Sequence, residues 1–337
     1  MTARAQQVWF RDALSVELRS VDMPRPRPGE VRVRTRLSAV SAGTELLVYR
    51  GQVPADMALD ASLESLSGSA RFPLQYGYAC VGEVEAAGAE VEASWLGKRV
   101  FAFAPHASHF LATPESVIVL PDDLSFDDAV FLANMETAVN LVHDGAPLLG
   151  ERVLVIGLGV VGLLLSALLA RFPLQTLSGI DGLARRREIA SDFGVHRVAG
   201  LDDDSQGVLG LSSPGMDLVY EVSGVPQALD TAIDCAGFAA RILVGSWYGS
   251  KAAPVALGGK AHRNRLTIRT SQVSTLAPEL TGRWDKARRF ASTLDMLRTV
   301  RPSRLISDRV ALQDAAELYD RLHRGAEDVV QAVFVYD

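Results

Sequence analysis

The sequence predicts an α/β protein with a β-rich first part followed by a doubly wound parallel sheet. Short strand-like runs separated by turn residues, such as VRVRTRLSAV and ACVGEVEAAG, fill most of the first 120 residues. From about residue 125, apolar strand-like runs alternate with helix-like segments. This order produces right-handed βαβ units and a parallel sheet. The chain has 337 residues, which is enough for two domains.

The predicted domain boundaries follow from these changes of pattern. The run Pro121-Asp122-Asp123 ends the strand-rich part, and SFDDAVFLANMETAVNLVHDG then starts helical spacing behind a capping serine. The last segment reads as a helix followed by a strand and is expected to return to the first domain. We therefore predict a β-rich domain over residues 1–123 and 277–337. Residues 124–276 form the predicted parallel-sheet domain.

Composition and charge exclude several classes of function. The chain is 48% hydrophobic and 22% charged, and its formal charge of −6 lacks the basic excess of a nucleic-acid-binding protein. Two cysteines, Cys80 and Cys235, cannot build a disulfide framework or a four-cysteine zinc lobe, and they indicate a reducing compartment. The N-terminal residues lack the apolar run of a signal peptide, and the apolar stretch 153–170 reads as a buried strand and helix. We expect a cytoplasmic protein without nucleic-acid or membrane partners.

A glycine motif predicts a dinucleotide site. The segment RVLVIGLGVVGLLLSALLA contains G-x-G-x-x-G between a strand-like run and a helix-like run. Gly157 would allow a tight turn, Gly159 would let the backbone approach a pyrophosphate, and Gly162 would let the helix pack closely. Val160 and Val161 complete the turn, where free N–H groups of the helix would meet the phosphates. The alternative is a plain strand–turn–helix whose glycines serve packing.

Residues near the ends of the next strands favour NAD. Asp181 ends the following strand-like run, where a carboxylate accepts hydrogen bonds from the adenosine ribose hydroxyls. Arg186, within three consecutive arginines, can instead hold the 2′-phosphate of NADP or lie in a solvated helical turn. Ser223 and Ser246 follow two further strands and are expected to contact the cofactor, while Trp247 forms a pocket wall or packs internally.

The whole chain resembles the medium-chain dehydrogenase/reductase superfamily, in its alcohol dehydrogenase-like group. The segments PGEVRVRTRLSAVSAGTE, YGYACVGEVEAAG and LGKRVFAF match the N-terminal pattern of that superfamily in order. The resemblance implies a GroES-like catalytic domain, a Rossmann domain and a C-terminal return to the first domain. It also implies a nicotinamide cofactor, a small-molecule substrate and a homodimer. It is more specific for fold and cofactor than for substrate.

The resemblance fails at the catalytic zinc ligands. The Cys-Gly-Thr-Asp segment of the superfamily appears as Ala-Gly-Thr-Glu at residues 42–45, and its Gly-His-Glu appears as Gly-Tyr-Ala at residues 77–79. Only Glu136 matches a third ligand position, and one acid cannot complete a zinc shell. The segment APHASHF replaces the region of the structural-zinc cysteines. The resemblance thus implies a zinc-free branch, near the bacteriochlorophyllide dehydrogenase-like group, with no metal.

Without zinc, a positioned acid must protonate the substrate oxygen. Tyr78 occupies the place of a lost ligand and is the predicted acid, or alternatively an aromatic wall of the pocket. Thr44 matches the proton-relaying hydroxyl of the superfamily, or is a turn residue bonded to its own backbone. Glu136 either orients Tyr78, acts as a base, or complements a helix dipole. Glu45, at the end of the Ala-Gly-Thr-Glu segment, could instead be a structural partner for a buried arginine.

His106 and His109 lie in the segment APHASHF. They could shuttle protons or bind a stray metal, but hydrogen-bonded loop histidines are the simpler interpretation. The first functional hypothesis is a zinc-independent NAD(P)(H)-dependent oxidoreductase that interconverts an alcohol and a carbonyl on a small organic substrate. The alternatives are a quinone/enoyl reductase-like reductase of an activated C=C bond and a non-catalytic nucleotide-binding sensor.

Overall fold

The computed structural model describes residues 4–54, 68–201 and 215–336, and the chain divides into two compact units. Unit 1 comprises Met1–Ala133 and Arg301–Asp337, and unit 2 comprises Asn134–Val300. Both boundaries lie later in the chain than the predicted ones. The second differs most, because helix α8 (Lys286–Val300) packs against helix α4 of unit 2.

Unit 1 is built on a seven-stranded mixed sheet. Its strands follow the order β14-β15-β3-β4-β5-β7, and β6 also pairs with β3. The C-terminal strands pair with β3 through β15, so the predicted return of the chain to the first domain is confirmed. The strands are β3 (Val31–Ala39), β4 (Cys80–Ala87), β5 (Arg99–Ala102), β6 (His109–Ala112), β7 (Val117–Val119), β14 (Ile306–Ala311) and β15 (Gln331–Val335).

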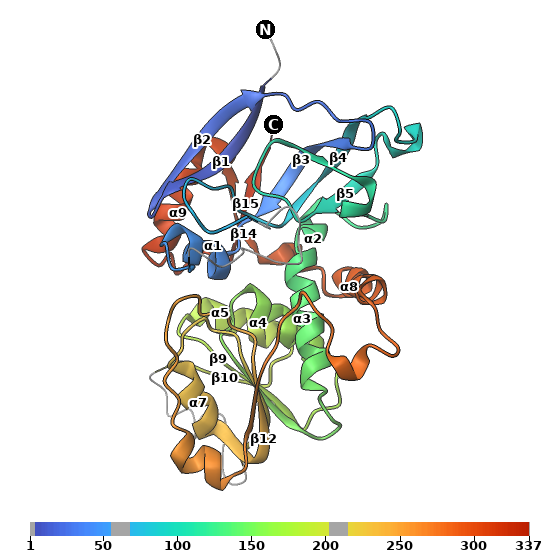
Figure 1. Ribbon diagram of the computed structural model, residues 1–337. Coiled ribbons are helices and arrows are strands. Elements are labelled where there is room, and N and C mark those ends of the chain that lie inside the picture. Colours follow the sequence, from blue (N-terminus) through green and yellow to red (C-terminus); the bar gives the residue numbers. More distant parts are fainter. Residues whose placement is uncertain (1–3, 55–67, 202–214, 337) are drawn as a thin grey trace. The chain divides into compact units, whose positions relative to one another are not determined.

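A separate hairpin and three helices complete unit 1. Strands β1 (Arg4–Asp12) and β2 (Ser15–Asp22) form the hairpin, and helix α9 (Ala315–His323) lies beside it (Figure 1). Helix α1 (Ala42–Tyr49) contacts both α9 and β1. The predicted capping serine is confirmed, because the Ser125 hydroxyl accepts a hydrogen bond from the Asp128 N–H at the start of α2 (Phe126–Ala129). Short helical turns are η2 (Ala93–Trp95), η3 (Pro114–Ser116), η6 (Pro302–Leu305) and η7 (Leu312–Asp314).

The alternation of side chains along β3 explains why this sheet has one buried face. Val31 and Val33 are fully buried, whereas the intervening Arg32 is partly exposed and pairs with Glu85 of β4 at 2.6 Å. Successive residues of a strand point to opposite faces. The hydrophobic side chains therefore enter the core of unit 1 while the arginines form pairs on the other face.

Unit 2 contains a six-stranded parallel sheet in the order β10-β9-β8-β11-β12-β13. The strand order reverses between β8 and β11, which is the switch point of a Rossmann fold. The predicted doubly wound parallel sheet is thus confirmed. The strands are β8 (Arg152–Ile156), β9 (Thr176–Ile180), β10 (Arg197–Ala199), β11 (Met216–Glu221), β12 (Ala236–Val244) and β13 (Thr267–Thr270).

Helices cover the sheet of unit 2. Helices α4 (Val160–Leu169) and α5 (Ala184–Asp192) follow β8 and β9 and lie next to one another (Figure 1). Helix α7 (Ala228–Cys235) follows β11, where the winding reverses, so right-handed crossovers place it on the opposite face. Other helical segments are α3 (Leu132–Gly145), which begins at the end of unit 1, and the turns η4 (Leu257–Ala261) and η5 (Pro278–Leu280).

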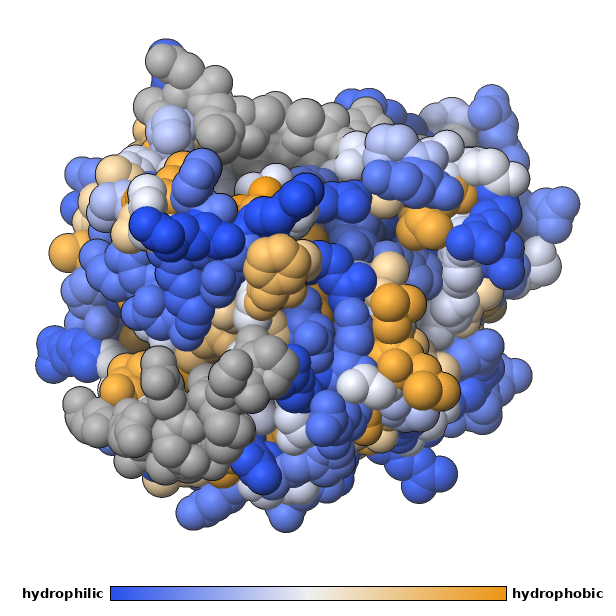
Figure 2. All heavy atoms as spheres, turned by 90° about the horizontal axis from the view of Figure 1, so that it is seen from below, coloured by the Kyte–Doolittle hydropathy of each residue, from blue (hydrophilic) through white to orange (hydrophobic). Residues whose placement is uncertain are grey.

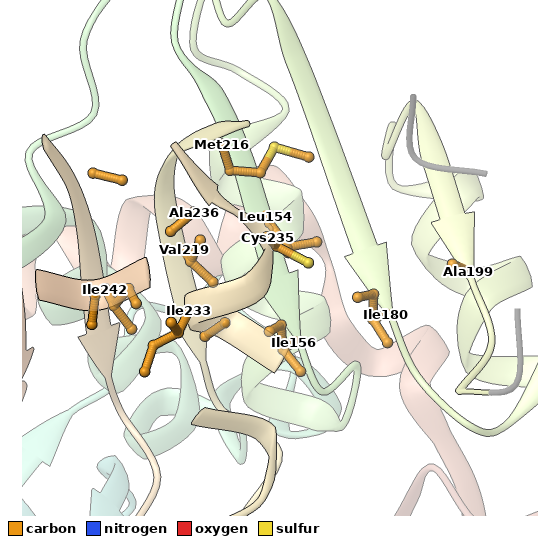
Figure 3. Packing of buried hydrophobic residues seen from close by; sticks show 13 residues of the cluster. Leu154, Ile156, Ile180, Ala199, Met216, Val219, Ile233, Cys235, Ala236 and Ile242 are labelled. Carbon is orange, nitrogen blue, oxygen red and sulfur yellow. The ribbon is translucent and has the colours of Figure 1, made fainter. Parts of the chain in front are cut away.

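The core beneath α7 is formed by residues of five neighbouring strands, β8 to β12. Leu154 and Ile156 of β8 project toward the same layer as Ile180, Val219 and other buried side chains (Figure 3). Strands buried on both faces read as continuous apolar runs, which explains the sequence RVLVI of β8. This packing fixes the carboxyl ends of β8, β9 and β11 relative to one another.

The surface view in Figure 2 is mainly hydrophilic, and its hydrophobic groups form small separate patches. Isolated apolar side chains of this kind are normal on a folded protein. Across the described residues, every helix is too short or too polar to cross a membrane.

Candidate functional site

The glycine motif forms the turn between β8 and α4. Gly157 has a positive φ of +94°, and a Cβ atom there would lie 2.5 Å from the Ser223 Cα atom. A Cβ atom on Gly162 would lie 1.9 Å from the Gly157 carbonyl oxygen, so only glycine lets α4 approach the strand this closely. In contrast, a Cβ atom on Gly159 would have no neighbour nearer than the Arg186 guanidinium, at 4.0 Å. The backbone at Gly159 is therefore open to a ligand.

Helix α4 begins directly after this open position. Gly159 is its N-cap residue, and Val160 and Val161 form a half-buried first turn. The first N–H groups of an α-helix have no partner within the helix, and the helix dipole favours an anion there. The turn thus has the geometry that a pyrophosphate requires.

Asp181, which directly follows β9, stabilises this turn. Its side chain is 8% exposed, and its two oxygens accept hydrogen bonds from the Leu158 N–H at 2.7 Å and the Leu183 N–H at 2.8 Å. These bonds fix the glycine turn and the start of α5. A carboxylate has further acceptor capacity on each oxygen, so the same group can also accept from ribose hydroxyls.

Among the three consecutive arginines, Arg186 lies at the site. Its Nη1 atom is 3.7 Å from the Asp181 carboxylate, and its buried Nε has no hydrogen-bond partner among the described residues. Arg187 instead donates to the backbone carbonyls of Asp181 and Gly182 at 2.7 and 3.0 Å. Arg186 therefore has an N–H group available for an anion beside the glycine turn.

Ser223 and Ser246 lie in the loops after β11 and β12. The Ser223 hydroxyl donates to the Glu221 carboxylate at 2.5 Å, and the Ser246 hydroxyl accepts from the Gly224 N–H at 2.8 Å. Both loops leave the carboxyl edge of the sheet, where ligands bind in such folds. Trp247 is half-buried next to Ser246.

In unit 1, the structure brings Tyr78 and Thr44 together. The Tyr78 hydroxyl donates a hydrogen bond to the Ser41 hydroxyl at 2.5 Å, and the Thr44 side chain lies close enough to influence its pKa. Burial raises the pKa of Tyr78, while the neighbouring Ser41 and Thr44 side chains partly offset that increase. The phenol therefore keeps its proton at neutral pH. Thr44 belongs to the first turn of α1 rather than to an open turn.

A fully buried polar network lies beneath these hydroxyl groups. His106 Nε2 is 3.0 Å from the Glu45 carboxylate, and His106 Nδ1 is 2.7 Å from the Ser38 hydroxyl. Tyr319 donates its hydroxyl hydrogen to Glu45, and the Tyr336 hydroxyl is 2.7 Å from Ser38. The alternative that Glu45 pairs with a buried arginine is wrong, because its buried partners are a histidine and a tyrosine.

This network connects the two segments that carry Tyr78 and Thr44. Glu45 also accepts a hydrogen bond from the Ser41 N–H at 2.8 Å, which fixes the start of α1. On the other side, a Cβ atom on Gly77 would lie 2.8 Å from the His106 ring, so the ring touches the turn before Tyr78. The Glu45–His106 pair thus fixes both segments.

His109 takes no part in this network. It lies on β6, where its ring contacts the Ser108 hydroxyl at 3.0 Å and Glu85 at 3.5 Å. Both histidines of the APHASHF segment are therefore hydrogen-bonded, as the simpler interpretation had it. His106 is structural and His109 lies at the surface of the sheet.

Glu136 is committed to a buried ion pair in unit 2. Its carboxylate accepts from Arg289 Nη2 at 2.6 Å and from Nε at 3.0 Å, and the Arg289 side chain is fully buried. Arg289 also donates to Asn140 Oδ1 at 2.7 Å and to the Val273 carbonyl at 2.5 Å. Burial raises the pKa of Glu136, and the charge of Arg289 opposes that shift. The pair ties α3 to α8.

Sequence reasoning missed several residues of these networks. Ser41 and Ser38 carry no motif, and Arg289 stands in a polar helix that gives no sign of its burial. Glu221 left a usable signal, because it is a charged residue at the end of the apolar run MDLVY. Tyr248, which hydrogen-bonds to Glu221, became visible only in three dimensions.

The four residues that the resemblance aligns with zinc ligands are unsuitable donors, each for a reason of its own. Ala42 and Ala79 have no ligating atom, Tyr78 is a protonated phenol, and Glu136 is paired with Arg289. Within residues 4–54, 68–201 and 215–336, no cluster of three His, Cys, Asp or Glu side chains could hold a metal ion. The donor set does not fit zinc.

Comparison with known proteins gives the fold a name. No family model matches the sequence. The 2R,3R-butanediol dehydrogenase of Bacillus subtilis superposes with a TM-score of 0.79 at 18% identity, over 99% of this chain and 100% of that one. A short chain alcohol dehydrogenase from Escherichia coli CFT073, solved with NADH, has the same TM-score and identity over 99% of both chains. The fold is that of the medium-chain alcohol dehydrogenases.

The sequence comparison also finds dehydrogenases. D-guloside 3-dehydrogenase of Escherichia coli K12 is 25% identical over 275 residues, which cover 77% of this chain and 78% of that protein. The similarity thus extends over both units of the medium-chain fold, including the β-rich part and the nucleotide-binding part.

We expect His106→Ala to destabilise the protein by about 3–5 kcal/mol, because it removes the one basic side chain that contacts the buried Glu45 carboxylate among the described residues. Urea unfolding followed by circular dichroism measures this change. The control is His109→Ala, which removes a partly exposed histidine and should cost less than about 1 kcal/mol. Equal losses in the two variants would contradict the central role of the buried pair.

Proposed function

We propose that this protein is an NAD(P)(H)-dependent oxidoreductase that interconverts an alcohol and a carbonyl on a small organic substrate. The observation that carries the proposal is the glycine turn at the switch point of the sheet. It combines an open backbone at Gly159 with a helix N-terminus and the carboxylate of Asp181. The names of the relatives, which include sugar and diol dehydrogenases, support a hydroxyl-bearing substrate.

We infer NAD as the preferred cofactor, with NADP as the alternative. Asp181 supports NAD, because a carboxylate accepts from ribose hydroxyls and repels a 2′-phosphate. Arg186 supports some use of NADP, because its guanidinium lies beside Asp181 and Gly159 through the Nη1 atom. Ser223 and Ser246 are proposed to contact the other end of the cofactor.

We expect Gly159→Ala to fold normally but to bind both NADH and NADPH at least tenfold more weakly, a loss of about 1.4 kcal/mol. The added methyl group meets only the Arg186 guanidinium at 4.0 Å within the protein, yet it enters the space proposed for the pyrophosphate. Fluorescence titration measures both affinities. The matched control is Gly29→Ala, because a Cβ atom at Gly29 also has no neighbour within 4 Å.

The choice of cofactor is tested in the same titrations. Native protein should bind NADH more tightly than NADPH, and Arg186→Ala should weaken NADPH more than NADH. Arg185→Ala, which changes an exposed neighbour, is the control. Tighter binding of NADPH than of NADH by native protein would overturn the NAD assignment, and unchanged binding in Gly159→Ala would refute the site.

We propose that catalysis is independent of zinc, because the residue types at the zinc position do not fit the metal. We propose that the protein belongs to a zinc-free branch of the medium-chain superfamily, near the bacteriochlorophyllide dehydrogenase-like group. When bound, the nicotinamide supplies the hydride chemistry. The chain must then provide a proton donor for the substrate oxygen, which a metal-free site requires.

Tyr78 is the proposed donor and Thr44 the proposed relay. Tyr78 keeps its proton because burial raises its pKa, and its hydroxyl contacts Ser41 and Thr44. A neutral phenol can donate to a developing oxyanion and recover its proton through a neighbouring hydroxyl. Glu136, also predicted as catalytic, is better suited to a supporting role, because Arg289 occupies its carboxylate.

We expect Tyr78→Phe to lower kcat by about 10²-fold or more, with little change in cofactor affinity, because it deletes only the donor. Steady-state kinetics on a reactive alcohol–carbonyl pair measure the effect. Thr44→Val should lower kcat by a smaller factor, whereas Thr299→Val, an exposed hydroxyl deletion on α8, should leave kcat unchanged.

Two outcomes would contradict this assignment. An unchanged kcat in Tyr78→Phe would reduce Tyr78 to a pocket wall and favour the C=C reductase or the sensor. The second is loss of native activity on treatment with a metal chelator, together with about one zinc per chain by elemental analysis. This result would show that other residues of the chain bind zinc.

We further propose a cytoplasmic homodimer. Both cysteines are buried and free, which suits a reducing compartment. Strand β13 is the edge of the parallel sheet, all four of its residues are exposed, and it pairs only with β12 among the described strands. An open edge offers unpaired N–H and C=O groups, which a second copy can pair across a twofold axis.

We expect Ile268→Asp to convert the dimer into a monomer, because it places a charge on this edge, where Ile268 is 37% exposed. Light scattering coupled to size-exclusion chromatography measures the mass. Leu149→Asp is the control, because Leu149 is an exposed leucine before β8, at 83% exposure. A monomeric native protein, or a dimer unaffected by Ile268→Asp, would contradict the proposal.

A further inference from the structure

A buried carboxylate lies at the switch point of unit 2. Glu221 is the last residue of β11, it is 0% exposed, and its neighbour across the ladder is Ile156 at the end of β8. The glycine turn follows Ile156 directly, and Ser223 closes against Gly157. Glu221 therefore lies under the crevice in which ligands of this fold bind.

The Glu221 carboxylate accepts three hydrogen bonds. Oε1 accepts from the Ser223 N–H at 2.8 Å and from the Ser223 hydroxyl at 2.5 Å. Oε2 accepts from the Tyr248 hydroxyl at 2.5 Å. Three donors around a carboxylate can stabilise its charged form, which the proposal below requires.

Tyr248 holds this carboxylate in place from the loop after β12. Burial and the hydrogen bond to Glu221 both raise the pKa of Tyr248, so the phenol remains a donor. The same loop is tied to the loop after β11 by Ser246, which accepts from the Gly224 N–H, and by Lys251, which donates to the Gly224 carbonyl at 3.2 Å. The position of Glu221 is thus defined by two linked loops.

The charge of Glu221 has no opposite partner. Across the described residues, no Lys, Arg or His side chain forms an ion pair with it, although Glu136 and Glu45 have Arg289 and His106 as close neighbours. A buried charge without a counter-charge is costly, and such a cost is usually retained for a function. The oxidised nicotinamide ring carries one positive charge, which the reduced ring lacks.

We propose that Glu221, positioned by Tyr248, is the counter-charge of the oxidised nicotinamide ring and favours binding of NAD⁺ over NADH. The inference rests on the proposed function, since it requires that a nicotinamide dinucleotide occupies this crevice. It assigns Glu221 and Tyr248 as positioning and selectivity residues for the redox state of the cofactor. The proposed proton transfer to the substrate remains the role of Tyr78 and Thr44 in unit 1.

The test compares the affinities of NAD⁺, NADH and ADP-ribose for native protein and Glu221→Gln by isothermal titration calorimetry. The amide keeps the size of the side chain and removes its charge. The ratio Kd(NAD⁺)/Kd(NADH) should rise on the order of tenfold, as Coulomb's law gives for unit charges roughly 10 Å apart at an effective dielectric constant of about 20. The affinity for ADP-ribose, which has no nicotinamide, should not change.

Two further variants separate the charge from other effects. Asp192→Asn removes one exposed negative charge at the end of α5, on the opposite edge of the sheet, and should leave the ratio as in native protein. Tyr248→Phe keeps the Glu221 charge but deletes one donor. Because it loosens the position of the carboxylate, it should raise the ratio Kd(NAD⁺)/Kd(NADH) by less than Glu221→Gln does, while the affinity for ADP-ribose stays constant.

The outcomes distinguish this inference from the proposed function. If native protein binds ADP-ribose and the ratio is the same in Glu221→Gln, the counter-charge is refuted while the cofactor site stands. If native protein binds none of the three ligands, the proposed function fails as well. If Glu221→Gln does not fold, the affinities of native protein for NAD⁺ and NADH test the inference. A tenfold tighter binding of NADH than of NAD⁺ would overturn it.

Discussion

The buried contact between Glu45 and His106 is the constraint on which the geometry of unit 1 depends. It joins helix α1 to the segment that packs under the Gly77 turn, and through Ser38 and Tyr319 it reaches β3 and α9. Polar groups without water must satisfy one another fully, so such a network accepts very few alternative arrangements. The two hydroxyl groups of the proposed active site inherit their separation from it. The side-chain hydrogen bonds of this network thus set the geometry of the two hydroxyl groups.

Unit 2 differs from unit 1, because its glycine turn has to leave space for a ligand. Gly157 and Gly162 bring backbone atoms into close contact, and Gly159 between them leaves its surroundings empty. Asp181 then holds the empty turn open through two backbone hydrogen bonds. One residue that is expected to recognise the cofactor therefore also maintains the shape of its site. A substitution at Asp181 would change both the recognition of the cofactor and the shape of the turn. A substitution at Gly159 would affect the cofactor site without removing the two hydrogen bonds of Asp181.

Local chemistry could be predicted from the sequence, and long-range pairing could not. The parallel sheet and the glycine turn follow from patterns within about 20 residues, where apolar runs and glycine spacing determine the backbone. The buried pairs join residues far apart in sequence: the residue numbers of Glu45 and His106 differ by 61, and those of Glu136 and Arg289 differ by 153. A single sequence contains no signal that matches an acid to its partner over such separations. The expectation of a buried arginine was sound, yet it was attached to the wrong glutamate.

The pairing of Arg289 with Glu136 has a consequence for the evolutionary history of the site. Substitutions at Ala42, Tyr78 and Ala79 alone would rebuild the missing zinc ligands in sequence but would not release the carboxylate of Glu136. Removing Arg289 first would leave that carboxylate buried without a counter-charge and would break the contacts of Arg289 with Asn140 and two backbone carbonyls. The step that releases the carboxylate of Glu136 therefore passes through a less stable protein. If the site is zinc-free as proposed, the pairing of Glu136 with Arg289 would help to keep it so, whatever substrate the protein uses.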